Sequence, residues 1–309
     1  MPHALPAPLD AAWYIPYAPW LAALARPALA GQWPVCLTEL ERLARAQGLT
    51  NARGLPLRFT DRLPDDGLPY ETRIHETGLV HTRTGEGAWH DLFNALVWLA
   101  FPRTKARLNA LQAAAIARAG VGARRGALRD AATLFDENAA LVVLREPGLR
   151  AAWRRHDWAA VCGVGRALPA WELAPVIFGH ALLEKLRAPY KAACAHAWLL
   201  DIPLPAGSDG ALGAAAPQVG VGRATMGPVT PDGLRRLDDA VAAGLDETLS
   251  GEAYVPLPVL GVPGWWPANA DPAFYDDPAV FRPAPRPRVR SGCARLATDR
   301  PESDGDPQP

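Results

Sequence analysis

Two histidine–carboxylate pairs are the residues of this 309-residue chain whose types and spacing best suit chemistry. His90 and Asp91 are adjacent at the start of an apolar stretch, and His180 and Glu184 are four positions apart. On a helix, this i,i+4 spacing brings an imidazole and a carboxylate to one face, where they can bind one cation or hydrogen-bond each other. We therefore expect His90, Asp91, His180 and Glu184 to form a divalent metal site or an acid–base site.

The same residues also have a structural interpretation. A carboxylate in the first turn of a helix complements the helix dipole, and i,i+4 pairs are common on helix surfaces. Asp136 and Glu137 could add carboxylates to a functional site. Both interpretations remain open from the sequence.

A basic cluster is the candidate for binding an anionic substrate. Arg103 and Lys105 follow Pro102, a residue typical of the first turn of a helix. The free N–H groups of such a turn favour negative charge, so we predict that Arg103 and Lys105 bind the substrate. The alternative is a solvated basic face, or salt bridges to the acidic segment 130–137.

A third pattern is the predicted order strand, strand, helix over residues 70–101. It places His75 on a hairpin and His90 on the following helix. This is the order found in ββα-metal nucleases, but the local spacing does not match their HNH motif, and the alternative is that these are core or hairpin histidines. The chain contains no GxSxG, HExxH, Walker A or GxGxxG motif that would indicate another reaction.

Composition limits the partners. The 32 basic and 32 acidic residues cancel, so no global field attracts nucleic acid or an anionic membrane. The most apolar run, residues 92–101, is about half the length needed to cross a bilayer. Four scattered cysteines and the absence of a signal peptide favour the cytoplasm. We expect a small anionic ligand as partner, rather than nucleic acid or a membrane.

Hydrophobic periodicity predicts a mainly helical α+β protein. Residues 1–281 are expected to form a single domain with a small β-hairpin or sheet, long Gly/Pro loops and a loop insertion at 203–233. A disordered tail is expected at 282–309. Helices are predicted over residues 19–30, 37–48, 89–101, 103–119, 127–134, 147–161, 178–187 and 232–249. A strand is expected near residues 57–59, a hairpin at 70–84 and a buried strand at 140–144, whereas 195–200 is ambiguous.

Five segments resemble the bacterial family known as domain of unknown function 3025. They are YETRIHETG (70–78), WHDLFNALVWLAFPRTKARLN (89–109), RDAATLFDENA (129–139), FGHALLEKLRAPY (178–190) and VLGVPGWWPANADPAFYDDPAVFRP (259–283). The resemblance implies a bacterial, cytoplasmic protein. It brings no established reaction and no catalytic residues.

The residues themselves favour a hydrolase-type enzyme acting on an anionic substrate. The alternative is a non-catalytic binding or scaffold protein in which the polar helix residues are structural. The two hypotheses differ in geometry, because an enzyme site requires His90 and His180 to converge on one open cleft.

Overall fold

The computed structural model describes residues 9–120, 126–144, 148–162, 175–200 and 230–283. Within these ranges helices predominate and two small sheets complete the structure, which confirms the predicted α+β class. The expected loop insertion at 203–233 and the expected disordered tail at 282–309 lie almost entirely outside the described residues, so both stay predictions.

Ten α-helices lie in the described residues: α1 (Ala18–Leu29), α2 (Trp33–Gln47), α3 (Tyr70–Thr77), α4 (Ala88–Ala100), α5 (Pro102–Ala119), α6 (Ala127–Asn138), α7 (Leu149–Arg154), α8 (Trp158–Val161), α9 (His180–Lys185) and α10 (Pro231–Gly244). Short 3-10 turns are η1 (Ala12–Tyr17), η2 (Gly251–Ala253), η3 (Val259–Gly261), η4 (Pro267–Ala270) and η5 (Pro272–Asp276). Proline in the first turn begins α2, α5 and α10, where its missing N–H costs nothing.

The strands form a pair and a four-stranded sheet. In the pair, β1 (Arg58–Thr60) runs parallel to β2 (Leu79–His81). The larger sheet has the order β4-β3-β5-β6, with β4 (Val176–Ile177), β3 (Ala139–Val143), β5 (Cys194–Leu200) and β6 (Tyr254–Pro258). β3 and β5 are parallel, and the two edge strands are antiparallel to them. On β6, Pro256 lies opposite His196 and Pro258 opposite Cys194.

The predicted hairpin at 70–84 is wrong, because Tyr70–Thr77 forms α3 and only Leu79–His81 is a strand. Pro69 precedes this helix and Gly78 ends it with a φ of 74°. This combination of proline before and glycine after is a helix signal that outweighs the few alternating apolar residues on which the hairpin rested. His75 therefore lies on α3, and β1 and β2 are parallel, so this stretch lacks the hairpin of a ββα-metal nuclease.

Two other segments differ in detail from the expectation. The helix predicted at 147–161 is divided into α7 and α8, with a break near His156, whose φ is 56°. The ambiguous stretch 195–200 belongs to strand β5. After β6 the chain continues in 3-10 turns that pack Tyr275 and Phe281 against the core.

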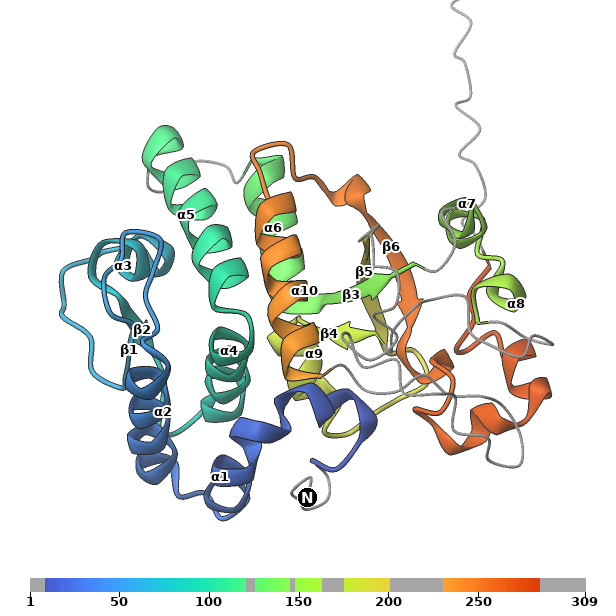
Figure 1. Cartoon of the computed structure of the whole chain (residues 1–309), viewed down its shortest axis with the longest axis horizontal. Helices are drawn as coiled ribbons and strands as arrows, with labels where there is room; N and C mark the ends of the chain where they lie inside the picture. The colour runs from blue at the N-terminus through green and yellow to red at the C-terminus, as the bar shows by residue number, and fades with distance from the viewer. Residues whose placement is uncertain (1–8, 121–125, 145–147, 163–174, 201–229, 284–309) are drawn as a thin grey trace, which may run out of the picture.

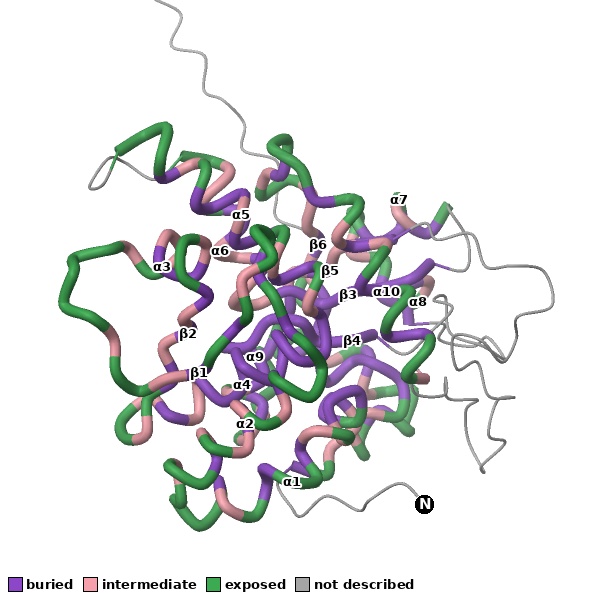
Figure 2. Tube along the Cα trace, turned by 60° about the vertical axis from the view of Figure 1, so that its left-hand side comes forward, coloured by how far each residue is buried: buried purple, intermediate pink, exposed green. Residues whose placement is uncertain are grey.

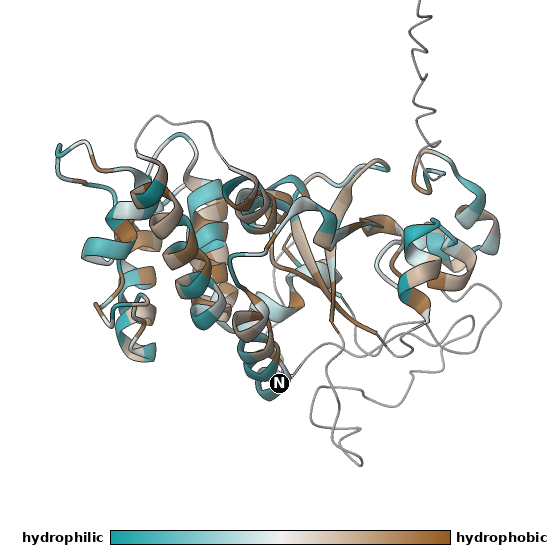
Figure 3. Cartoon of the chain, turned by 90° about the horizontal axis from the view of Figure 1, so that it is seen from above, coloured by the Kyte–Doolittle hydropathy of each residue, from teal (hydrophilic) through white to brown (hydrophobic). Residues whose placement is uncertain are grey.

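Helix α4 lies at the centre of the core (Figure 2), and each residue from Asp91 to Ala100 is buried. Trp98 and Phe101, predicted as core residues, are 1% and 0% exposed. In Figure 1, α1–α5 and the β1/β2 pair lie on one side of the molecule, and the larger sheet lies beyond α6, α9 and α10. The strands of that sheet are mainly hydrophobic, whereas the helices carry hydrophilic stretches (Figure 3). No helix in the described ranges is long and apolar enough to cross a bilayer.

Candidate functional site

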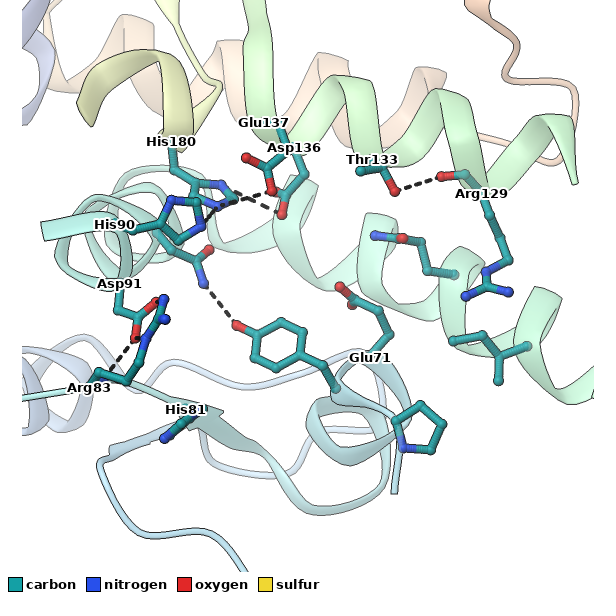
Figure 4. Close-up of a pocket in the computed structure, with 15 residues that line it drawn as sticks. Glu71, His81, Arg83, His90, Asp91, Arg129, Thr133, Asp136, Glu137 and His180 are labelled. Carbon is teal, nitrogen blue, oxygen red and sulfur yellow. Dashed lines mark hydrogen bonds and ion pairs between the residues drawn. The ribbon is translucent and has the colours of Figure 1, made fainter. Parts of the chain in front are cut away.

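A polar cavity of about 480 Å³ opens between α3, β2, α4, α5, α6 and α9. Figure 4 shows His90 and His180 gathered with Asp136 and Glu137 at one end, and His81 apart from them on β2. The residues that line it are Pro69, Tyr70, Glu71, His81, Arg83, His90, Asp91, Asn94, Gln112, Ile116, Arg129, Thr133, Asp136, Glu137 and His180. Three of the four predicted catalytic residues, His90, Asp91 and His180, therefore line one open cavity.

The two histidine rings meet through their Nε2 atoms. The Nε2 atoms of His90 and His180 are 3.0 Å apart, and the rings lie edge to face at an interplanar angle of 72°. Two nitrogens that bind one ion at about 2.0–2.1 Å lie about 2.9–3.4 Å from each other, depending on the coordination geometry. The spacing of the two Nε2 atoms fits that range.

Each histidine also faces a carboxylate through its Nδ1 atom. His90 Nδ1 lies 3.1 Å from Glu184 Oε2, and His180 Nδ1 lies 3.7 Å from Asp136 Oδ2. Because a carboxylate only accepts hydrogen bonds, the Nδ1 of His90 is the donor. This tautomer leaves the Nε2 lone pair directed at the other histidine. Glu184, predicted as a ligand, thus orients His90 from behind.

Glu137 supplies the third donor of the cluster. Its Oε1 atom is 3.7 Å from Nε2 of His180, and ligand atoms of His90, Glu137 and His180 all lie within 4.8 Å of one another. Burial and the neighbouring Asp136 raise the pKa of Glu137. This end of the cavity would therefore be stabilised by additional positive charge.

A close contact between two elements brings His180 to the cluster. Gly179 precedes α9 and lies against the backbone at the end of α6, where a Cβ would collide with Asn138. Its N–H donates to the carbonyl of Ala139 at 2.9 Å. Only glycine allows this approach, which sets the first residue of α9 beside the last turn of α6.

Lys105 belongs to a buried network behind the histidines and does not line the cavity. Its ammonium group donates to Asp136 at 2.5 Å and to Asn94 at 2.8 Å, and Asn94 donates to the hydroxyl of Tyr70 at 2.9 Å. Burial alone would raise the pKa of Asp136, but Lys105 together with His180 and His90 outweighs burial and holds this pKa below its usual value. Lys105 therefore helps to keep Asp136 an anion that faces His180.

Glu71 lies on α3 and lines the same cavity. Asn109 donates to its Oε2 atom at 2.6 Å and to its backbone carbonyl at 2.9 Å. Burial, reinforced by the negative charge of Asp136, raises the pKa of Glu71 to about 7. This carboxyl group can therefore change its charge near neutral pH.

The structure does not bring Asp91 into the histidine cluster. Asp91 accepts three hydrogen bonds from Arg83: two from the guanidinium group, at 2.7 and 2.8 Å, and one from the backbone N–H, at 2.8 Å. Figure 4 shows the pair on a different wall of the cavity from Glu137. Asp91 thus fixes the β2–α4 connection.

Arg103 is also placed away from the cluster. It is exposed and pairs with Asp239 of α10 beside a second, more apolar cavity of about 670 Å³. The N–H groups at the start of α5 are already bound, because Asp238 accepts from the N–H of Arg103 at 3.0 Å and of Thr104 at 2.8 Å. The chain therefore provides its own anion at the position where an anionic substrate was expected.

Helix α6 contains the residues that sequence reasoning undervalued. Asp136 and Glu137 lie in its last turn, and Arg129 lies in its first turn. Acidic residues at the C-terminal end of a helix and a basic residue at its N-terminal end both oppose the helix dipole. Asp130 also lies in the first turn, so the sequence signal that could have directed attention to α6 is its acidic last turn.

Comparison with protein families gives one informative result. The family described as "Protein of unknown function (DUF3025)" matches residues 57–285. This range contains the cavity and the histidine cluster. Searches of curated proteins and of solved structures gave no match.

Proposed function

Since the chain belongs to the family of proteins of unknown function DUF3025, its reaction must be argued from its own residues, and we propose that it is a metal-dependent hydrolase. The ligands in this proposal are Nε2 of His90, Nε2 of His180 and a carboxylate oxygen of Glu137. Glu184 orients His90 through a hydrogen bond to its Nδ1, and Asp136 faces Nδ1 of His180 at 3.7 Å, which is too long for a hydrogen bond.

The facing Nε2 atoms carry the proposal. His90 donates its Nδ1 proton to Glu184, so its Nε2 lone pair faces Nε2 of His180 at 3.0 Å, and a proton on Nδ1 of His180 would leave both Nε2 atoms as acceptors. Such an arrangement requires a shared cation or proton. Carboxylate–histidine–metal arrangements of this kind are the usual second shell of a protein metal site.

The charge of His180 supports a metal rather than a proton. Burial lowers the pKa of His180 to about 4, so its imidazole is neutral at pH 7 and has a lone pair to donate. Two histidines and one carboxylate are a donor set typical of zinc and iron. A divalent ion held by it would lower the pKa of a bound water and polarise a carbonyl or phosphoryl oxygen.

The cavity provides the remaining requirements of an enzyme site. It is open to solvent beside the histidines and has room for a small polar molecule. The convergence of His90 and His180 favours the enzyme over the scaffold alternative, which would allow the two residues to lie far apart. We retain the expectation that the substrate is anionic.

We further propose that the protein works in the bacterial cytoplasm. Cys36 and Cys194 are free thiols, which is in keeping with a reducing compartment. Fractionation of bacterial cells tests this location, and we expect the protein in the cytoplasmic rather than the periplasmic fraction.

Elemental analysis tests the metal. Protein purified without chelator is expected to contain about one zinc or iron ion per chain. The variants His90→Ala, His180→Ala and Glu137→Gln should each lose the metal and any esterase or phosphatase activity found in a screen of nitrophenyl substrates.

His75→Ala is the matched control, because His75 is partly buried on α3 and does not line the cavity. This variant should retain the metal. Absence of a stoichiometric metal from wild-type protein, together with failure to bind added Zn²⁺, Fe²⁺ or Mn²⁺, would favour the scaffold alternative.

A further inference from the structure

The end of the cavity away from the histidines carries its own pair of charged residues, Arg129 and Glu71. In Figure 4 both lie on the opposite side of the cavity from His90 and His180. We propose that this end, with Arg129 as the main contact, is the subsite that binds an oxyanion group of the substrate, a carboxylate or a phosphate. Its role in catalysis rests on the proposed hydrolase function, whereas its binding of an anion is separately measurable.

Arg129 differs in its partners from Arg83, which also lines the cavity, and from Lys105, which lies behind it. The guanidinium group of Arg83 is held by Asp91, and Lys105 is held by Asp136. Arg129 forms no ion pair with a residue of the described ranges, although it is only partly exposed. A planar guanidinium group that is not engaged can bind a carboxylate or a phosphate through two parallel hydrogen bonds.

The position of Arg129 on its helix is a second, independent observation. Arg129 lies in the first turn of α6, where the helix dipole disfavours positive charge. An anion bound to Arg129 would compensate both the side chain and the N-terminal end of this helix. Asp130 in the same turn complements the helix dipole, and an anion bound to Arg129 would add to this effect.

Glu71 determines when the subsite is open to an anion. The charged groups that act on it are Asp136 and Arg129 from α6, Lys105 from α5 and the neighbouring Tyr70 from α3. Their combined effect, with burial as the largest cause, raises the pKa of Glu71 to about 7. Below this pH a neutral Glu71 can donate a hydrogen bond to an anion, whereas above it the carboxylate repels the anion and competes for Arg129.

The two ends of the cavity define a substrate class. The metal end would act on an ester, amide or phosphoester bond, and the Arg129 end would hold an oxyanion some distance along the same molecule. We therefore expect a small hydrolysable compound with a free carboxylate or phosphate group.

Calorimetric titration of the full-length protein with acetate and with inorganic phosphate tests the subsite, in separate arms that distinguish the two oxyanions. At pH 6, Arg129→Gln should weaken the binding of the preferred probe roughly tenfold to a hundredfold, as expected for the loss of a charge-assisted pair. Arg129→Lys should give an intermediate loss, because it keeps the charge without the planar fork. Unchanged melting temperatures would verify that both variants fold.

Arg103→Gln is the matched control, since Arg103 is an exposed arginine beside the other large cavity and should leave both affinities unchanged. The pH arm uses acetate, which does not titrate between pH 6 and 8. Wild-type affinity should fall over this range, and Glu71→Gln should remove most of that fall.

Metal content, measured on the same variants, separates this inference from the proposed function. Arg129→Gln with normal metal content and weakened anion binding supports the subsite. Normal anion binding in Arg129→Gln, loss of binding only in His180→Ala, or no binding of either probe to the wild type would each overturn it. Anion binding that depends on Arg129 in a protein without metal would support the subsite and refute the hydrolase.

Discussion

Whether Nε2 of His90 or His180 can bind a metal depends on whether the proton of that imidazole is on Nδ1. A carboxylate behind an imidazole fixes the tautomer, orients the ring and raises its basicity as a ligand. Glu184 does this for His90 at 3.1 Å, and Asp136, itself held by Lys105, faces His180 at 3.7 Å. The affinity of the proposed metal site should therefore depend on residues that are not themselves ligands.

Glu184→Ala should weaken zinc binding roughly tenfold to a hundredfold, because His90 loses the partner that orients its ring. Competition with a fluorescent zinc chelator measures this change. Lys185→Ala, at the neighbouring exposed position of α9, should bind zinc like the wild type. Equal affinities in both variants would show that Glu184 has no positioning role.

At this scale the sequence predicted the histidines but not their complete set of partners. Helical spacing correctly brought His180 and Glu184 to one helix, and the first-turn position of His90 placed it at the edge of the core. Spacing within one helix contains no information about contacts between helices. The approach of Glu137 to His180 and the binding of Asp91 by Arg83 were therefore not predictable from the sequence.

At the scale of the elements, the site depends on how closely α9 approaches α6. Gly179 makes this approach possible because its hydrogen atom occupies a space that a methyl group would not fit. Metal sites tolerate displacements of only about 0.5 Å in their ligands. A single added carbon at position 179 should consequently displace His180 from the site, although residue 179 is not itself a ligand.

Gly179→Ala is expected to destabilise the protein by about 1–3 kcal/mol, as an overpacked contact does, and to weaken zinc binding roughly tenfold or more. Urea denaturation and the chelator competition measure the two effects. Gly148→Ala is the control, because no heavy atom lies near the position of its added Cβ. Wild-type zinc affinity in Gly179→Ala would mean that the close approach does not position His180.

The elements themselves were predictable where the apolar pattern is long. Helices α4 and α5 have enough turns for their periodicity to identify them, and their proline junction was read from the sequence. Helix α3 is only eight residues long, and over such a length alternation at period two and helical spacing select overlapping positions. Pro69 before the segment and Gly78 after it indicate a helix more reliably than the apolar pattern does.

At the scale of the whole molecule, the three proposed ligands come from positions 90, 137 and 180 and from three different helices. An ion bound to all three can exist only in the folded chain. Metal binding must therefore stabilise the native state by mass action.

Zinc at about a hundred times its Kd should raise the free energy of unfolding by about 2.7 kcal/mol. Thermal or urea denaturation with and without zinc measures this increase. His180→Ala should show no comparable stabilisation, and His75→Ala should behave like the wild type. An equal effect of zinc on wild type and His180→Ala would place the ion elsewhere.

The edge strand β6 has a consequence for how copies of the protein behave toward one another. The N–H of Val259 donates to the carbonyl of Ala193, so the alternate positions Pro256 and Pro258 turn their nitrogens away from β5. Neither nitrogen carries a hydrogen, and the carbonyl of Pro256 already accepts from the indole of Trp153 at 2.6 Å. A foreign strand would find no donor at either proline, which is a known defence against edge-to-edge aggregation. Pairing of a strand from a second copy with β6 is therefore disfavoured, and we expect no aggregation of the protein through this edge at high concentration.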